Sequence, residues 1–236
     1  MKGVHNLLVA TLVLALTQAA NAQFNLGIMG GANLANFSAT KPVVIDAGDN
    51  EMAQGSFTSR TAAGFGVVLD YSFSPRVTLS IQPMFAQHGS KLQLQDPVPD
   101  GVGKEHNVKL SYFDIPVMFK VNLGSAGVRP YVTSGFTFGF LASAKTQAAG
   151  KDANKQDVDV KSSFKSTNFA WNIGGGLGFA AGKSTIFIEG RYLLGLTNVR
   201  KGSGAVPLSV ERIRTDEAKT RGVQILAGVS FPLGAR

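Results

Sequence analysis

The chain has 236 residues, no cysteine and a formal net charge of +8. The lack of cysteine excludes a disulfide framework and thiol chemistry. A basic balance can indicate nucleic-acid binding. The chain starts with the features of an exported protein, however, and such a protein does not normally meet nucleic acid. Its charges also gather in loops.

The first 22 residues have the three parts of a secretory signal peptide in order. Lys2 supplies a positive start, Leu7–Leu16 is an apolar run, and Ala20-Asn21-Ala22 is a small-residue cleavage site. This run is too short for a membrane-spanning helix. The alternative, a buried first helix, does not explain all three parts. We therefore expect residues 1–22 to be removed and residues 23–236 to form one domain.

No apolar run in the remaining chain approaches the ~18 residues that a spanning helix needs, so a membrane could be crossed only by strands. Apolar and polar residues alternate in eight segments, which predicts eight β-strands. They lie near residues 24–37, 62–73, 77–91, 108–123, 128–145, 166–179, 184–198 and 221–233.

The connections between these strands alternate in length. Short turns are expected at 74–76, 124–127 and 180–183, and long polar loops at 38–61, 92–107, 146–165 and 199–220. This pattern is typical of an antiparallel up-and-down meander with both termini at the tight-turn end.

Pairing outward from the three short turns predicts the register of three hairpins. Arg191 is then expected opposite Asn172, Asp114 opposite Thr137, and Asp70 opposite Ser80. In each hairpin the apolar faces meet, which a slip of one residue would prevent. Pro83 and Pro116 should lie at a similar height and mark a bulge or weak point in the ladder.

Charge decides which strand face points outward. A soluble lipocalin-like barrel would carry many charges on its polar faces, whereas an outer-membrane barrel has a polar interior and an apolar exterior. The charges expected within the strands are few and share the face that is rich in small polar residues. They are Asp70, Asp114, Lys120, Glu189 and Arg191. We therefore predict an all-β, eight-stranded antiparallel up-and-down transmembrane β-barrel, whose filled interior holds these charges as a network with a sum of −1.

Aromatic residues stand where the two membrane interfaces would be. We expect an aromatic girdle rather than a scatter of core aromatics. Its members are Tyr71, Phe73, Trp171, Phe179 and Tyr192.

Four strand segments, "GIMGGANLANFS", "YFDIPVMFKV", "RPYVTSGFTFGF" and "IFIEGRYLLGLTNV", resemble the porin-family or PorT-like outer-membrane β-barrel domain of Gram-negative bacteria. The resemblance covers the mature chain and implies an eight-stranded barrel in the cell outer membrane, with both termini periplasmic. The last strand, "QILAGVSF", resembles the signal read by the barrel-insertion machinery, through Gln224, Val229 and Phe231, although Leu226 replaces the usual glycine.

Motifs for chemistry are weak. "AGKST" lacks the earlier glycine and the helix of a phosphate-binding loop. His88, with Ser90 close by, could belong to a nucleophile–base arrangement, but no spacing selects it. We expect no catalytic residue, metal or cofactor.

The loops hold most of the charge, with five Lys against three Asp from Lys145 to Lys165. They could bind phosphates of lipopolysaccharide or simply stay solvated. The interpretation is an outer-membrane barrel with a structural or interaction role through its extracellular loops. Two alternatives remain: an accessory component of a secretion or envelope-assembly system, and a lipid-modifying enzyme that uses His88.

Overall fold

The computed structural model describes residues 23–39, 42–45, 50–95, 105–124, 127–149, 157–202, 206–207, 212–215 and 217–233. The expected signal peptide therefore lies outside the described residues. The described elements are β1 (Gln23–Ala39), β2 (Val43–Ile45), β3 (Glu51–Thr58), β4 (Arg60–Ser72), β5 (Val77–Ile81), β6 (Met84–Leu94), β7 (Glu105–Asn122), β8 (Val128–Ala149), β9 (Val158–Asp159), the 3₁₀-helix η2 (Lys161–Ser163), β10 (Thr167–Ala181), β11 (Ser184–Gly195), β12 (Val206–Pro207), β13 (Arg212–Arg214) and β14 (Ala218–Leu233).

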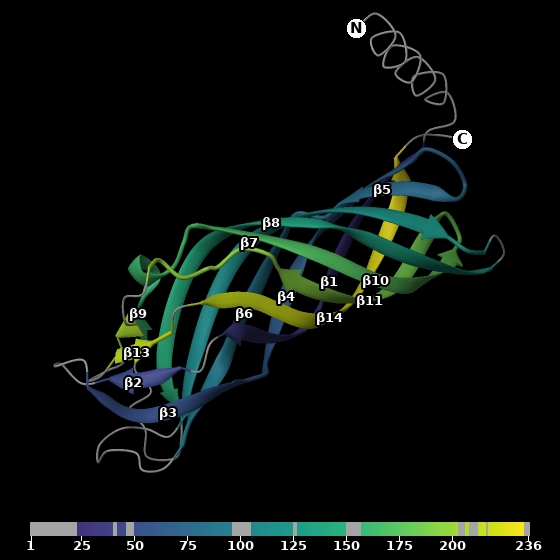
Figure 1. Ribbon diagram of the computed structural model, residues 1–236. Coiled ribbons are helices and arrows are strands. Elements are labelled where there is room, and N and C mark those ends of the chain that lie inside the picture. Colours follow the sequence, from purple (N-terminus) through teal and green to yellow (C-terminus); the bar gives the residue numbers. More distant parts are fainter. Residues whose placement is uncertain are drawn as a thin grey trace, which may run out of the picture.

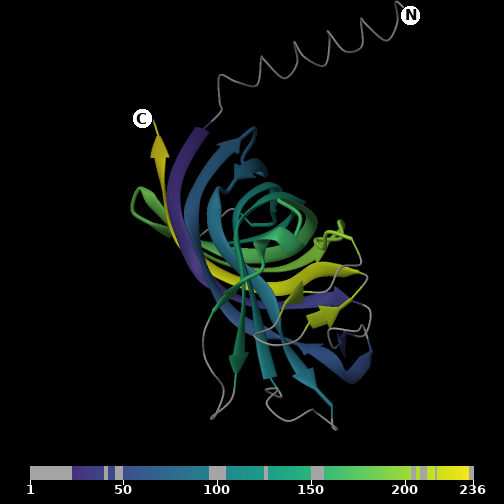
Figure 2. The same cartoon turned by 90° about the vertical axis from the view of Figure 1, so that its left-hand side faces the viewer.

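Antiparallel strands close into a barrel with eight strand positions, one of which is shared by β5 and β6 (Figures 1 and 2). In order around the ring, these positions are β1, β4, β5 followed by β6, β7, β8, β10, β11 and β14. The first and last strands close the ring, because β1 pairs with β14 from Phe24↔Leu233 to Ala39↔Ala218. Closure leaves no open edge, which is the condition for strands to cross lipid.

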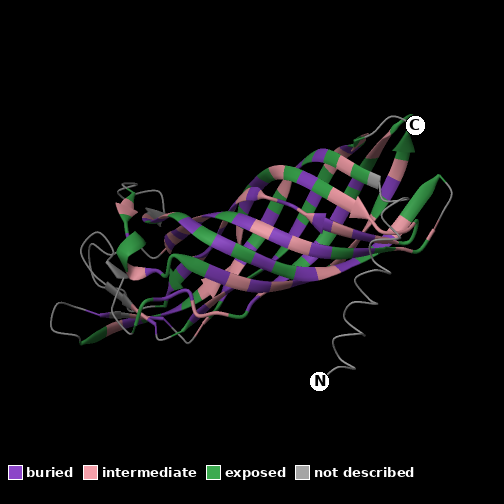
Figure 3. Cartoon of the chain, turned by 90° about the horizontal axis from the view of Figure 1, so that it is seen from above, coloured by how far each residue is buried: buried purple, intermediate pink, exposed green. Residues whose placement is uncertain are grey.

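The outer face of the wall is apolar, as the alternation predicts. On β7, Phe113, Phe119 and Val121 are at least 40% exposed, whereas Asp114 and Lys120 are buried at 1% and 7% exposure. Figure 3 shows the same alternation of exposed and buried residues along the other strands. The predicted orientation, with apolar residues outside and charged residues inside, is confirmed.

Two of the three predicted hairpin registers are wrong by two residues. Arg191 pairs with Gly174 rather than Asn172, and Asp114 pairs with Gly139 rather than Thr137. The β10–β11 turn needs only two residues, because Gly182 adopts a left-handed conformation at φ 63° that glycine tolerates. The β7–β8 turn is longer than expected, since Leu123 N–H donates to Pro130 O at 2.8 Å. A slip of two keeps every side chain on its predicted face.

The third register, Asp70↔Ser80, is confirmed. Pro83 does interrupt the ladder, since it separates β5 from β6, but β7 runs unbroken through Pro116. The Pro116 carbonyl accepts a hydrogen bond from Gln82 N–H at 2.9 Å, and the Pro83 carbonyl accepts one from Val67 N–H at 3.0 Å. The register of β7 is the same on both sides of the break.

The predicted long loops are partly structured, which is a correction. β3 lies within the expected loop 38–61 and pairs with β6 from Gly55↔Leu94 to Thr58↔Lys91, while β2 and β13 add a small sheet beside it. Between Thr58 and Gly64 the β3–β4 side has one residue more than β6, which is a bulge. The alternation therefore shifts by one residue there, and this shift hides β3 from a period-two reading.

Candidate functional site

The barrel interior is crossed by one arginine. Arg191 lies on β11 and is 2% exposed. Its Nε donates to Gln224 Oε1 on the neighbouring β14 at 2.6 Å, and its Nη1 donates to Gln82 Oε1 at 2.6 Å. Its Nη2 lies 3.2 Å from Met84 Sδ. Gln82 and Met84 belong to the β5–β6 wall, which is diametrically opposite β11 in the eight-membered ring. The guanidinium therefore spans the lumen.

Three further predicted charges lie in a chain with Arg191. Glu189 Oε1 is 3.5 Å from Arg191 Nη1, and its Oε2 is 4.0 Å from Lys120 Nζ. Lys120 Nζ is 3.5 Å from Asp70 Oδ1. The Tyr131 hydroxyl donates to Glu189 Oε2 at 3.0 Å. These two cations and two carboxylates sum to zero, so the chain is electrically balanced.

Asp114, the fifth predicted charge, has a different partner. Its Oδ2 lies 2.7 Å from His88 Nε2, and both side chains are 2% exposed. His88 Nδ1 lies 3.3 Å from Asn33 Nδ2, and the ring packs edge-on against Tyr112 with centroids 5.4 Å apart. The prediction of a single network of five charges left out His88, which is the partner of Asp114.

Glycines make room for large interior side chains at this level. A Cβ at Gly176 would lie 2.5 Å from Tyr131 Oη, and one at Gly228 would lie 2.5 Å from Phe187 Cζ. Tyr131 and Phe187 are 7% and 5% exposed. Lys120 Nζ lies 5.5 Å and 5.4 Å from the centroids of these two rings, within the range of cation–π attraction. Aromatic rings and paired charges thus fill the middle of the barrel.

The pattern of faces inverts toward the loop end. On β7 the outward residues are apolar as far as Phe113, but the next outward positions are Ser111, Lys109 and Asn107. Behind them the interior becomes apolar, with Leu110 and Val108 at 0% and 4% exposure. On β8 the change follows Phe140, which pairs with Phe113. The wall beyond this level has an apolar core and a polar exterior, as a water-soluble barrel would.

An apolar cluster forms the core of this loop-end extension. Its buried members are Phe37, Ala53, Leu92, Leu94, Val108, Leu110, Tyr112, Leu141, Ala144, Val160, Phe164, Val199 and Ala218. Arg200 is 1% exposed there, with its guanidinium carbon 5.7 Å from the Phe164 ring centroid. Burial lowers the pKa of Arg200 from its ordinary value, but an arginine keeps its proton at physiological pH.

Ion pairs join segments at the surface of the extension. Asp157 lies 3.5 Å from Lys109 Nζ and 3.3 Å from Lys145 Nζ, and Arg214 Nη2 lies 2.8 Å from Glu51 Oε1. Within the described parts of the chain, no group of three or more His, Cys, Asp or Glu is placed to hold a metal ion. The described residues also include no helix long and apolar enough to cross a membrane.

The expected girdle residues lie on the outer wall. Tyr71 packs edge-on against Phe73, with centroids 4.7 Å apart, and Trp171 Nε1 donates to Ser134 Oγ at 3.1 Å. Tyr192 is 40% exposed. Phe179 also lies on the outer wall, half-buried.

The three residues of the expected insertion signal divide between the two faces. Phe231 points outward at 50% exposure, and Val229 is half-buried on the same face. Gln224 points inward to Arg191.

Sequence reasoning missed the neutral partners of these charges. Gln82, Gln224, Met84 and Tyr131 hold Arg191 and Glu189, but none carries a charge that would reveal it. The only available signal was their position on inward strand faces. The arrangement also differs from a nucleophile–base pair, because the two ring nitrogens of His88 contact Asp114 and Asn33. Ser90 Oγ has no hydrogen-bond partner among the described residues.

A closed ring of eight strands with an apolar exterior and a polar, filled middle defines an outer-membrane β-barrel protein. The chain belongs to the family described as "Outer membrane protein beta-barrel domain", which matches residues 17–201. This is the porin-like class that the strand segments resemble.

Among solved structures, the chain is similar to Neisserial surface protein A, with 13% identity, 89% of this chain and 97% of that chain covered, and a TM-score of 0.48. It is also similar to OprG of Pseudomonas aeruginosa, with 12% identity, 89% and 96% coverage, and a TM-score of 0.49. The outer membrane protease OmpT of Escherichia coli has 12% identity, 89% and 97% coverage, and a TM-score of 0.45. A comparison with curated proteins gave no match. At such low identity a shared barrel does not imply a shared activity.

Proposed function

We propose that this outer-membrane barrel is closed to solutes and acts through its extracellular loop end, in a structural or interaction role. The observation that carries the proposal is the inversion of faces at Phe113 and Phe140, which gives the loop end its own apolar core. A strand needs about 9–11 residues to span the hydrocarbon region. The 18 residues of β7 and the 22 of β8 exceed that length. The residues beyond the level of Phe113 and Phe140 form the loop-end extension, a folded unit in water that we call the platform.

The closed lumen supports the same proposal. Eight strands enclose a space that side chains can fill, and water-filled channels belong to barrels of about 16–18 strands. Arg191 bridges opposite walls here, and Tyr131, Lys120 and Phe187 occupy the space beside it. A barrel filled in this way anchors the platform and does not serve as a diffusion pore.

The remaining parts of the proposal concern assembly and partners. Residues 1–22 direct export, and Val229 and Phe231 on the outer face of β14 are read during insertion. The girdle of Tyr71, Phe73, Trp171, Phe179 and Tyr192 sits at the interfaces, and both termini are periplasmic. Basic residues of the platform fit the phosphates of lipopolysaccharide as partner chemistry. We propose no enzymatic activity, because the ring nitrogens of His88 contact Asp114 and Asn33 and no serine hydroxyl among the described residues.

The orientation test uses the absence of cysteine in the chain. A single cysteine is introduced in the platform as Lys201→Cys, or in the tight turn as Lys183→Cys; both lysines are exposed. A membrane-impermeant maleimide should label the first variant on intact cells and the second only after the outer membrane is permeabilised. The reverse pattern would refute the proposed orientation.

Closure of the lumen is tested by conductance in a planar bilayer. The wild-type barrel should show no large, steady ion conductance and no sugar permeation in vesicles. Arg191→Ala should increase the conductance, because it removes the side chain that crosses the lumen. A matched change outside the strands, Arg76→Ala in the exposed turn between β4 and β5, should not. Large, steady wild-type conductance would overturn the claim that the barrel is closed.

A further inference from the structure

The barrel wall has a window between β1 and β3 at the base of the platform. Pairing of β1 with β4 stops at Ala35↔Arg60, and β3 pairs with β6 and β2 but not with β1. The edges of the window are joined below by Asn36 Nδ2 and Ser59 Oγ at 3.5 Å, and above by Gly55 N–H and Pro42 O at 2.9 Å. Between these two contacts, no ladder hydrogen bond closes the wall among the described residues.

A cavity of about 370 Å³ lies at this window. This volume falls within the ~300–1,000 Å³ typical of small-molecule pockets. The cavity is lined by inward residues of both edges and by exposed outward residues, so it extends from the outer surface into the wall. The lining residues are Phe37, Ser38, Ala39, Pro42, Gln54, Gly55, Ser56, Phe57, Gln95 and Arg221.

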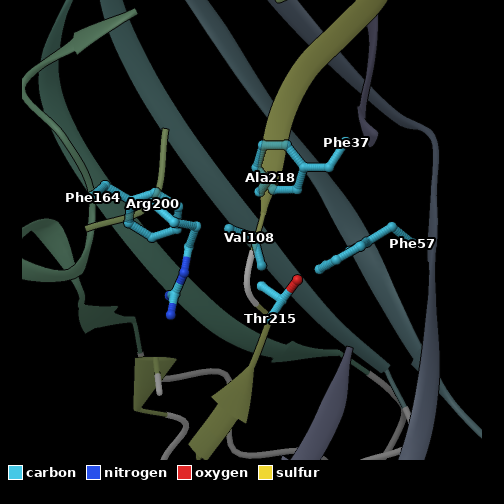
Figure 4. Close-up of a pocket in the computed structure, with 7 residues that line it drawn as sticks. All are labelled: Phe37, Phe57, Val108, Phe164, Arg200, Thr215 and Ala218. Carbon is cyan, nitrogen blue, oxygen red and sulfur yellow. The ribbon is translucent and has the colours of Figure 1, made fainter. Parts of the chain in front are cut away.

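Two aromatic rings separate this cavity from a second pocket inside the platform. Phe37 and Phe57 meet edge-on with centroids 5.5 Å apart, and both line both pockets. The inner pocket holds only about 20 Å³. Figure 4 shows it with Phe37 and Phe57 on one side and Phe164 with Arg200 on the other. Rotation of the two rings would join the outer cavity to the inner pocket, whose other lining residues are Val108, Phe164, Arg200, Thr215 and Ala218.

The window lies at the upper edge of the apolar outer face. On β1 the last exposed apolar residue is Leu34, and on β14 it is Val223; they pair with each other. The next outward pair is Asn36 with Arg221. A molecule resting in the outer leaflet would therefore meet the window at the level of its head group, with apolar wall directly below.

The charge of the lining selects an anion. Among the described lining residues, Arg221 is the one that carries a charge; it is exposed, and its side chain makes no ion pair or hydrogen bond with any described residue. The described residues that line the cavity include no carboxylate. From the window, the cavity and this charge, we propose that the site binds a single-chain anionic amphiphile from the outer leaflet, with its head group on Arg221 and its chain against Phe37 and Phe57. This site goes beyond the proposed platform role.

The occupant enters no further than the platform. Tyr112, a member of the apolar cluster, contacts His88, and these two residues with Asp114 fill the lumen at 0–2% exposure. Arg191 crosses the lumen beneath them. The window is therefore a binding site and not a route to the periplasm.

The test places a fluorescent reporter at the window. The chain has one tryptophan, so Trp171→Phe with Phe57→Trp leaves a single reporter there. The protein is reconstituted in nanodiscs of zwitterionic lipid, and its fold is checked by the difference in gel mobility before and after boiling. The probe is a medium-chain carboxylate brominated at its tail end, which quenches a nearby tryptophan. The same chain with a phosphate head identifies which anion is preferred, and the same chain as an alcohol removes the charge.

Saturable quenching is expected for the anionic probes, with weaker binding of the alcohol. Arg221→Gln should weaken anion binding about tenfold, the scale of one hydrogen bond to a charged group. Lys219→Gln is the matched control, because Lys219 lies two residues along the same strand and outside the cavity, 3.9 Å from Glu217. It should leave the affinity unchanged.

Two results would overturn the proposal. One is non-saturable quenching equal to that of Trp171 in the wild type, which would indicate partition into lipid alone. The other is an equal affinity in Arg221→Gln and Lys219→Gln. If the reporter variant fails the gel test, equilibrium dialysis of the radiolabelled carboxylate against the wild type and the two charge variants gives the same comparison. Either result leaves the conductance and labelling tests of the proposed function unaffected.

Discussion

Arg191 and Gln82 meet across the full width of the barrel, with Nη1 donating to Oε1 at 2.6 Å. The bond joins β11 to the strand break at Pro83 on the opposite wall, so the site where the ladder is weakest is also the site that receives the guanidinium. The same arginine is 3.5 Å from Glu189.

The Arg191–Glu189 pair should behave as a coupled unit. Both side chains are 1% exposed. Removing one partner leaves an uncompensated buried charge, which costs about 3–5 kcal/mol of unfolding free energy. We expect Arg191→Met and Glu189→Gln each to be strongly destabilising, and the double variant to recover part of the loss. The measurement is guanidinium unfolding in lipid vesicles, followed by gel mobility. Strict additivity of the two losses would contradict the coupling.

Gly176 should not accept a methyl group. A Cβ there would lie 2.4 Å from Ile188 O and 2.5 Å from Tyr131 Oη, which donates to Glu189. Gly176→Ala should therefore destabilise the barrel by about 1–3 kcal/mol, the usual cost of overpacking. Gly190→Ala is the control, since nothing lies within 4 Å of a Cβ at Gly190. Equal stabilities of the two variants, measured by the same unfolding assay, would count against a filled interior.

Phe231 should matter more for assembly than an equally exposed phenylalanine elsewhere. Phe231 lies on the last strand and is 50% exposed, while Phe65 on β4 is 66% exposed. If the terminal strand carries the insertion signal, Phe231→Ala should lower the amount of folded barrel in the outer membrane. Phe65→Ala should change this amount little, because Phe65 does not lie on the last strand. Both variants lose a similar apolar surface, so a difference between them reports on the signal and not on contact with lipid. Fractionation of membranes with unboiled gels measures this, and equal yields would refute the signal.

The mature chain should begin at Gln23. Ala20-Asn21-Ala22 supplies the small residues at the expected cleavage site, so intact-mass measurement of the membrane-purified protein should show the loss of residues 1–22. Ala22→Phe should block processing, since the site requires small residues. A mature protein that retains Met1 in the outer membrane would disprove the signal-peptide assignment.

The sequence was sufficient to predict the ring and its orientation, because both depend on parity. Strand alternation has a period of two, and the five charges, which all lie on the face rich in small polar residues, identified the interior. The register of two hairpins was wrong, because it depends on turn length. The difference between a two-residue and a four-residue turn moves Arg191 from Asn172 to Gly174 without changing its face.

The loop end could not be predicted in the same way, because two signals change there at once. The outer face becomes polar after Phe113, and the bulge before Arg60 shifts the parity between β3 and β4. If one strand face is assumed to be apolar throughout, the sequence of this region is interpreted as polar loops. The window has no local signal at all, since it exists only because two strands far from the turns fail to pair.

The pairing of β1 with β14 also sets the timing of assembly. Phe24 pairs with Leu233, so the first strand of the barrel stays unpaired on one side until the last strand is in place. In hydrocarbon each unpaired backbone group costs several kcal/mol, and in water an open edge invites association with other chains. An incomplete barrel is therefore unfavourable both in lipid and in water. The strand that completes the hydrogen bonding is the one that carries Phe231. If Phe231 belongs to the insertion signal, as proposed, the strand that is recognised is also the strand that closes the barrel.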